Sequence, residues 1–141
     1  MKIKTILIIA FVALSYVFTV GFTNTTNEKY VALQQPKWTA PSSADKNINP
    51  LKNDFNSVKA GKKLYSQLCA VCHGPKGKGD GMAGAGLTPK PTNLTSDDIQ
   101  SQSDGAIFWK ITLGRAPMAS YKDILPEKQR WQIINYIKTL R

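Results

Sequence analysis

Apolar and polar residues follow a helical pattern in the C-terminal part of the chain. Apolar positions between Val58 and Leu68 recur at i, i+3, i+4 and i+7, which predicts an amphipathic helix with Asn56 or Ser57 as its N-cap. This helix would run directly into Cys69. Because no run of five or more residues alternates at period 2, we predict an all-α domain.

Capping residues and helix breakers indicate further elements. A short helix is expected after residues 95–96, and a longer one over Gly105 to Leu113, with Ser103 or Asp104 as its cap and Gly114 at its end. The last helix should begin at Pro126, which the first turn of a helix tolerates. It should run to about Leu140 and bury Trp131, Ile134 and Ile137. The glycine-rich segment 74–86 is predicted to be a loop.

The N-terminus has the features of an export signal. Lys2 and Lys4 precede an uncharged apolar run, Ile6–Phe22, which is long for the core of a signal peptide and slightly short for a membrane span. We expect residues 1–23 to be a cleaved signal peptide, with an uncleaved N-terminal membrane anchor as the alternative. In either case the rest of the protein lies outside the cytoplasm.

A polar segment separates this run from the predicted domain. Residues 24–53 contain three prolines and show no helical or strand periodicity, so they are expected to form an extended arm or linker. Trp38 stands out in this segment, and it is either packed on the domain or exposed to solvent. The folded domain is predicted to span residues 54–141.

The net charge and the number of cysteines exclude several classes of function. The net charge is +10, from 19 Lys and Arg against 9 Asp and Glu, but the basic residues are scattered rather than clustered with aromatic residues. We therefore expect no binding to nucleic acid, and a docking surface for an acidic protein is a better interpretation. Two cysteines and one histidine exclude a disulfide-dense scaffold and a four-cysteine zinc site.

The sequence Cys69-x-x-Cys72-His73 carries the strongest chemical signal. On a helical turn the two cysteines lie on one face, where both can bond to the vinyl groups of one haem, and His73 can then bind the iron. A redox-active cysteine pair would be expected in a βαβ context, a zinc site needs more ligands, and a disulfide leaves His73 unexplained. The pentapeptide therefore predicts one covalently attached haem c.

The sixth ligand of the iron is expected to be a methionine, since the chain has no second histidine. Met118 follows Pro117 in a loop and is the predicted ligand, whereas Met82 lies within the glycine-rich loop and would have to fold back across the ring. A neutral thioether favours ferrous iron and raises the reduction potential relative to a second imidazole. Two protein ligands leave no open site for oxygen, so the expected activity is electron transfer rather than catalysis.

These residues lie within longer stretches that resemble class I c-type cytochromes, in particular the small mono-haem domains of bacterial respiratory chains and cbb3-type oxidases. The resemblance covers Asp54 to Arg141, with weaker similarity in the arm. The matching stretches are Ala60–Tyr65, Cys69–Pro75, Gly77–Gly81, Lys90–Thr95, Pro117-Met118 and Arg130–Ile137.

The resemblance implies a cytochrome c fold, in which three to four helices and long loops enclose the haem and the N- and C-terminal helices cross. It implies that Gly61 is the small residue at this crossing, with the aromatic ring of Tyr136 set against it. It also implies that a proline carbonyl, from Pro89 or Pro91, accepts a hydrogen bond from the Nδ1 of the haem-binding His73.

Two further side chains near the predicted site have alternative roles. Arg115 either contacts a haem propionate or is a solvated surface residue. Trp109 either lines the haem pocket or belongs to the helix core, and the core is the favoured interpretation.

The predicted function is that of an exported mono-haem electron carrier between respiratory partners, with Cys69, Cys72, His73 and Met118 as the haem-binding residues. The alternative is a haem c subunit fixed in a larger membrane oxidoreductase, with the arm as its docking segment. Expected partners are redox proteins, which include membrane respiratory complexes, and membrane association would occur through the N-terminal segment. A gas sensor or peroxidase is disfavoured because Met118 would fill the position that such proteins leave open.

Overall fold

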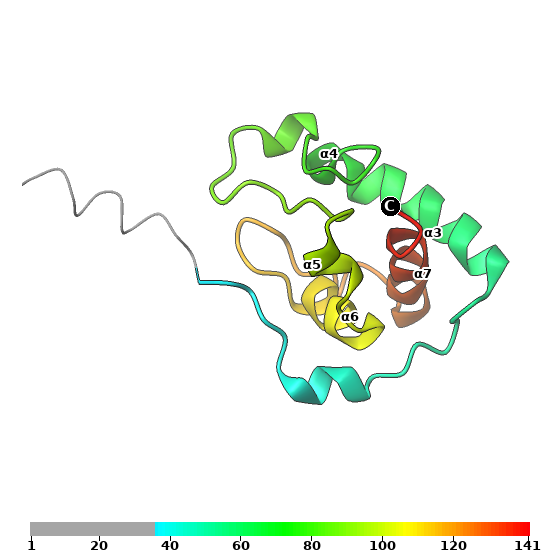
Figure 1. Ribbon diagram of the computed structural model, residues 1–141. Helices are drawn as coiled ribbons and strands as arrows, with labels where there is room; N and C mark the ends of the chain where they lie inside the picture. Colours follow the sequence, from blue (N-terminus) through cyan, green and yellow to red (C-terminus); the bar gives the residue numbers. More distant parts are fainter. Residues whose placement is uncertain (1–35) are drawn as a thin grey trace, which may run out of the picture. The chain divides into compact units, whose positions relative to one another are not determined.

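The computed structural model describes residues 36–141, and those from Lys37 to Arg141 form one compact unit. The predicted signal peptide or anchor and the first part of the predicted arm lie outside the described residues. No strand occurs in the described part, which confirms the predicted all-α fold (Figure 1). No helix within residues 36–141 is long and apolar enough to cross a membrane.

The unit contains five α-helices and two 3-10 helices, joined by long loops (Figure 1). The longest are α3, α6 and α7, and α4 follows α3 almost directly. The bounds are η1 Ser42–Lys46, α3 Phe55–Leu68, α4 Ala70–His73, η2 Met82–Gly84, α5 Asp97–Gln100, α6 Asp104–Leu113 and α7 Glu127–Ile137.

The start of α3 differs from the prediction. The carboxylate of Asp54 accepts hydrogen bonds from the backbone N–H groups of Asn56, at 2.8 Å, and Ser57, at 3.2 Å. Asn56 and Ser57 are therefore donors in the first turn, and the prediction that one of them is the cap was wrong. Asp54 takes this position because its backbone is extended and its short carboxylate can bind two of the free N–H groups at the helix start.

The other helix boundaries agree more closely with the prediction. The Ser103 hydroxyl caps α6 by accepting from the Ala106 N–H at 3.0 Å, and Gly114 ends the helix with a positive φ of 65°. Pro126 directly precedes α7. This last helix ends at Ile137, before the predicted Leu140.

The helices α3 and α7 touch at Gly61. A Cβ atom at this position would lie 1.8 Å from the carbonyl oxygen of Gln132, so only glycine allows the two backbones to approach this closely. The predicted role of Gly61 is therefore confirmed. Tyr136 of α7 also lies at the contact of these two helices, where its ring packs against the buried ring of Tyr65 of α3 at a centroid distance of 5.1 Å.

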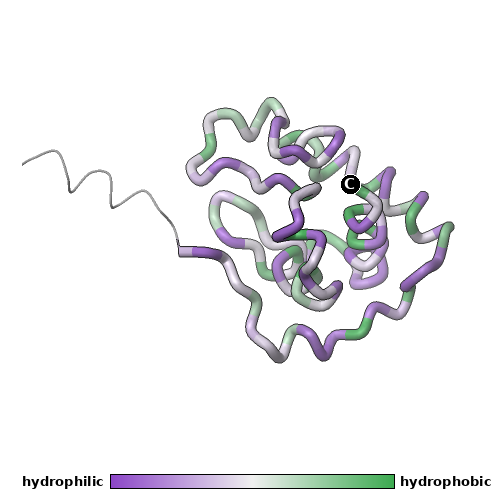
Figure 2. The backbone as a smooth tube through the Cα atoms, viewed as in Figure 1, coloured by the Kyte–Doolittle hydropathy of each residue, from purple (hydrophilic) through white to green (hydrophobic). Residues whose placement is uncertain are grey.

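The core lies where α3, α6 and α7 meet. Trp131, Ile134 and Ile137 are buried as predicted, and Trp131 stacks on Phe108 of α6 at 4.0 Å between ring centroids. Each helix carries both hydrophobic and hydrophilic positions along its length (Figure 2). The core therefore holds α3, which precedes the cysteines, against α6 and α7, which flank the loop that contains Met118.

The second half of the predicted arm belongs to the compact unit. Ala44 in η1 is 2% exposed, and its carbonyl lies against Gly105 of α6, where a Cβ would be only 2.1 Å away. The Asn49 amide donates to Asp104 at 2.9 Å and to Asn135 at 2.7 Å. The predicted domain boundary at residue 54 therefore falls inside the unit.

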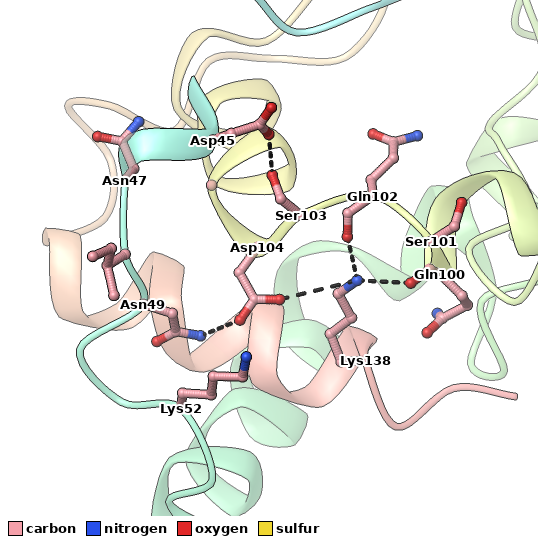
Figure 3. Close-up of a pocket in the computed structure, with 12 residues that line it drawn as sticks. Asp45, Asn47, Asn49, Lys52, Gln100, Ser101, Gln102, Ser103, Asp104 and Lys138 are labelled. Atoms are coloured by element: carbon pink, nitrogen blue, oxygen red, sulfur yellow. Dashed lines mark hydrogen bonds and ion pairs between the residues drawn. The ribbon is translucent and has the colours of Figure 1, made fainter. Parts of the chain in front are cut away.

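A polar pocket of about 380 Å³ lies along this seam (Figure 3). The Lys138 ammonium points into it and donates to the backbone carbonyls of Gln100 and Gln102, with the Asp104 carboxylate 4.0 Å away. The cysteines, His73 and Met118 do not line this pocket. Its hydrogen bonds join the arm, α6 and the end of α7.

Candidate functional site

The two cysteines and the histidine lie on one turn of backbone at the end of α3. The carbonyl oxygen of Cys69 accepts hydrogen bonds from the N–H groups of Cys72, at 3.1 Å, and His73, at 2.8 Å. This spacing places the two cysteines one turn apart on the same side of α4. Both are free thiols and both are partly buried.

The imidazole of His73 is oriented by a backbone carbonyl. Its Nδ1 lies 3.1 Å from the carbonyl oxygen of Thr92. The prediction that Pro89 or Pro91 supplies this carbonyl was wrong, because the chain presents the carbonyl of the residue after Pro91. With the proton on Nδ1, the lone pair of Nε2 is available to a metal.

The glycine-rich loop holds Thr92 and the cysteine turn in place. The Gly79 N–H donates to the His73 carbonyl at 2.8 Å, and a Cβ on Gly79 would lie 2.3 Å from the carbonyl oxygen of Pro91. The Gly81 N–H donates to the Cys72 carbonyl at 3.1 Å, and a Cβ there would lie 2.5 Å from the carbonyl carbon of Cys72. The small size of these glycines lets the loop lie directly against the turn.

Burial sets the protonation of the turn. It lowers the pKa of His73, an effect that the hydrogen bond to Thr92 partly offsets, so the imidazole is neutral and able to bind a metal. Burial, followed by the charge on Cys72, raises the pKa of Cys69 to about 12, so this thiol stays protonated.

The donor set fits an iron that is brought in by a porphyrin. Within residues 36–141 no group of three or more His, Cys, Asp or Glu side chains could hold a metal ion. His73 alone cannot retain a free metal, but it needs to supply only one axial bond when a macrocycle provides four nitrogen ligands. Two free thiols on the same turn match covalent attachment of that macrocycle.

Met118 ends a tight turn in the loop between α6 and α7. Its N–H donates to the carbonyl of Arg115 at 2.9 Å, and its side chain is partly buried against the hydrophobic core. Met82, the other methionine in the described chain, is 91% exposed on η2.

The Met118 loop and the cysteine turn converge at Tyr121, which sequence reasoning missed. The Tyr121 hydroxyl donates to the carbonyl of Leu68 at 3.2 Å, next to the first cysteine. Burial, and then the nearby Cys69 and Cys72, raise the pKa of Tyr121. Its position three residues after Met118 was the only sequence signal for this contact.

Trp109 and Arg115, for which the sequence left alternative roles, both contact Trp38 of the arm. Trp109 is partly buried and lies outside the core cluster, so its predicted place in the core was wrong. Instead its ring lies 6.2 Å from that of Trp38. The Arg115 guanidinium lies 5.1 Å from the centroid of the same Trp38 ring.

Comparisons with known proteins place this geometry in context. A family model described as Cytochrome c matches residues 58–141. Cytochrome c-554(547) of Halothiobacillus neapolitanus is 36% identical over an alignment of 91 residues, which covers 58% of this chain and 94% of that protein.

Solved structures include two similar chains. One comes from the reducing HAO-like protein complex Kustc0457/Kustc0458 of Kuenenia stuttgartiensis, with a TM-score of 0.59 and 26% identity over 78% of the present chain. The present chain spans about half of that one, 53% of its length. The second is the KustC0563 c-type cytochrome, with a TM-score of 0.49 and 26% identity, covering 57% of this chain and 96% of that one.

Proposed function

The chain belongs to the cytochrome c family, and on that premise we propose that it is an exported mono-haem carrier of single electrons between respiratory proteins. Membership makes it an electron-transfer protein with covalently bound haem c. Cys69 and Cys72 would form the two thioether bonds to the haem, and His73 and Met118 would bind its iron.

One observation carries this proposal. Two free thiols and an imidazole share a single turn, and the Nδ1 of that imidazole faces the Thr92 carbonyl at 3.1 Å. The carbonyl fixes the ring, so that Nε2 is left for the iron. A redox cysteine pair would have no use for this orientation of His73, and a zinc site would need more ligands than residues 36–141 bring together.

The protein residues determine the redox and ligand-binding properties of the haem. The haem iron supplies the one-electron change between its ferrous and ferric states. Met118 contributes a soft, uncharged sulfur that favours the ferrous state, and His73 stays oriented in both states because Thr92 holds it. With Met118 and His73 both bound, the protein excludes oxygen and peroxide from the metal.

Replacement of Met118 tests the ligand assignment. Met118→Ala should bind carbon monoxide readily in the ferrous state and should have a lower reduction potential, because the sulfur that favours ferrous iron is gone. The matched control is Met82→Ala, which removes a methionine that is 91% exposed and should leave both properties unchanged. An unchanged spectrum in Met118→Ala, with a changed one in Met82→Ala, would transfer the role to Met82.

Export belongs to the same proposal. Residues 1–23 act as a cleaved signal peptide, and the carrier works in the periplasm or on the outer side of the cytoplasmic membrane. The net charge of +10 suits acidic redox partners. The mass of the mature protein tests cleavage, since retention of residues 1–23 would indicate a membrane anchor.

A second function is favoured by one comparison. The chain resembles part of a chain from a reducing HAO-like protein complex, which supports a role as a fixed haem c subunit of a larger oxidoreductase. Purification from detergent-solubilised membranes separates the two functions. A fixed subunit should remain with the same partner proteins at high salt, whereas a diffusible carrier should elute alone.

A further inference from the structure

The indole ring of Trp38 contacts two cationic side chains and one aromatic ring. The guanidinium carbon of Arg115 lies 5.1 Å from its centroid, and the Nζ of Lys110 lies 5.9 Å from it. The ring of Trp109 lies 6.2 Å away at an interplanar angle of 58°. Trp38 therefore joins the arm both to α6 and to the loop that follows it.

Arg115 is the first residue of the turn that ends at Met118. The hydrogen bond of 2.9 Å from the Met118 N–H to the Arg115 carbonyl closes this turn. A shift of Arg115 would therefore be transmitted to the backbone of Met118. The contact between Trp38 and Arg115 acts on the turn from outside, through the Arg115 side chain.

The other end of the loop is attached to α6 by hydrogen bonds. The Tyr121 N–H donates to the Ile111 carbonyl at 3.1 Å, and the Ser120 hydroxyl donates to the Thr112 carbonyl at 2.7 Å. These bonds fix the residues that follow Met118. Trp38 acts on the residues that precede it, so the two sets of contacts hold the turn from both ends.

The arm itself is anchored on both sides of Trp38. The neighbouring Lys37 forms an ion pair with Asp98 of α5, and Ala44 is buried against α6. The indole ring is therefore attached to the domain independently of the loop that it contacts. The arm therefore presents the face of this ring to the Arg115 guanidinium, as a cation–π contact requires.

We propose that Trp38 is a positioning residue for the sixth iron ligand: by holding Arg115, it keeps the turn in the geometry in which Met118 reaches the iron. This rests on the proposed role of Met118. Trp38 does not touch the iron, and its contribution is to disfavour the state in which the sulfur has dissociated.

Binding of imidazole to the ferric holoprotein measures that state, because imidazole competes with the methionine for the same iron position. Trp38→Ala should raise the apparent affinity for imidazole about tenfold, within the range that a partly desolvated cation–π contact implies. Trp38→Phe keeps an aromatic face and should restore most of the wild-type affinity. Arg115→Gln removes the same contact from the turn and should match Trp38→Ala, so the contact can be tested even if one variant folds poorly.

The matched control is Asp45→Ala, in the same arm. Asp45 accepts a hydrogen bond from Ser103 at the start of α6, so its loss loosens the arm without touching the Met118 turn. This variant should unfold at lower urea but bind imidazole as the wild type does. Equal effects of Asp45→Ala and Trp38→Ala on imidazole affinity would overturn the proposal and assign Trp38 a general structural role.

The wild-type protein separates this proposal from the proposed function. Ferric iron bound to methionine gives a weak charge-transfer band at the red end of the visible spectrum, and Met118→Ala should lack it. If the wild type also lacks the band, the ligand assignment fails, and the inference about Trp38 fails with it. If the band is present and Trp38→Ala and Arg115→Gln leave imidazole affinity unchanged, only the inference about Trp38 is overturned.

Discussion

The two sides of the candidate haem site are built in different ways. On the cysteine side, Cys69, Cys72 and His73 lie on one turn, and backbone hydrogen bonds from the Gly79–Gly81 loop hold it. On the methionine side, the turn ending at Met118 is held by the side chain of Arg115 and by that of Tyr121, which donates to Leu68 at 3.2 Å. The first side depends on close backbone packing against glycines, and the second depends also on side-chain contacts with distant segments, from Arg115 to Trp38 and from Tyr121 to Leu68.

Removing the thiols should have the largest effect, because it breaks the cysteine side completely. Replacing both Cys69 and Cys72 by alanine should abolish the haem stain that remains on the protein after a denaturing gel. Val71→Ala is the matched control, since this residue is 53% exposed within the same turn, and its haem stain should persist. A persistent stain in the double variant would rule out attachment at these cysteines.

Filling the space at Gly81 should test whether backbone packing holds the cysteine side. The added methyl group would meet the Cys72 carbonyl carbon at 2.5 Å, so Gly81→Ala should lower the free energy of unfolding by about 1–3 kcal/mol. Urea denaturation of the holoprotein measures this change.

Gly86→Ala provides the control for Gly81, because no atom lies within 4 Å of a Cβ there. This variant should differ from the wild type by less than about 0.5 kcal/mol. Equal stability of the two glycine variants would show that the loop can shift to accommodate a methyl group at position 81. Close backbone packing would then not be what holds the cysteine side.

Removing the Tyr121 hydroxyl should have the smallest effect and tests the methionine side. Tyr121→Phe keeps the ring but loses the hydrogen bond to the Leu68 carbonyl, which should cost about 1 kcal/mol in urea denaturation. Ser66→Ala removes an exposed hydroxyl bonded within α3 and should change stability less. A larger loss in Ser66→Ala would argue against a specific contribution from Tyr121.

The sequence was most informative where chemistry and geometry are local. The Cys69–His73 turn, the Ser103 cap and the buried positions of α7 depend on residues within a few places of one another, and each could be predicted from spacing. The cap of α3 was missed because Asp54, Asn56 and Ser57 are all residue types that can cap a helix, and Asp54 does so through its extended backbone.

Contacts between distant segments could not be predicted in the same way. The carbonyl that orients His73 is a backbone group, which no residue type reveals. That Thr92 rather than Pro91 supplies it depends on how closely the loop packs on Gly79. The arm is attached through Ala44 and Asn49, which follow no periodicity. Trp38 was visible as an unusual residue, but its contact with Arg115 required the fold.

The start of the compact unit at Lys37 limits how far the domain could stand from a membrane. If residues 1–23 were retained as an anchor, only residues 24–36 would serve as a tether, with a fully extended length of about 45 Å. A tether that included residues up to 53 would instead extend about 105 Å. An anchored form would therefore deliver electrons to acceptors close to the bilayer surface and would be unable to serve distant ones.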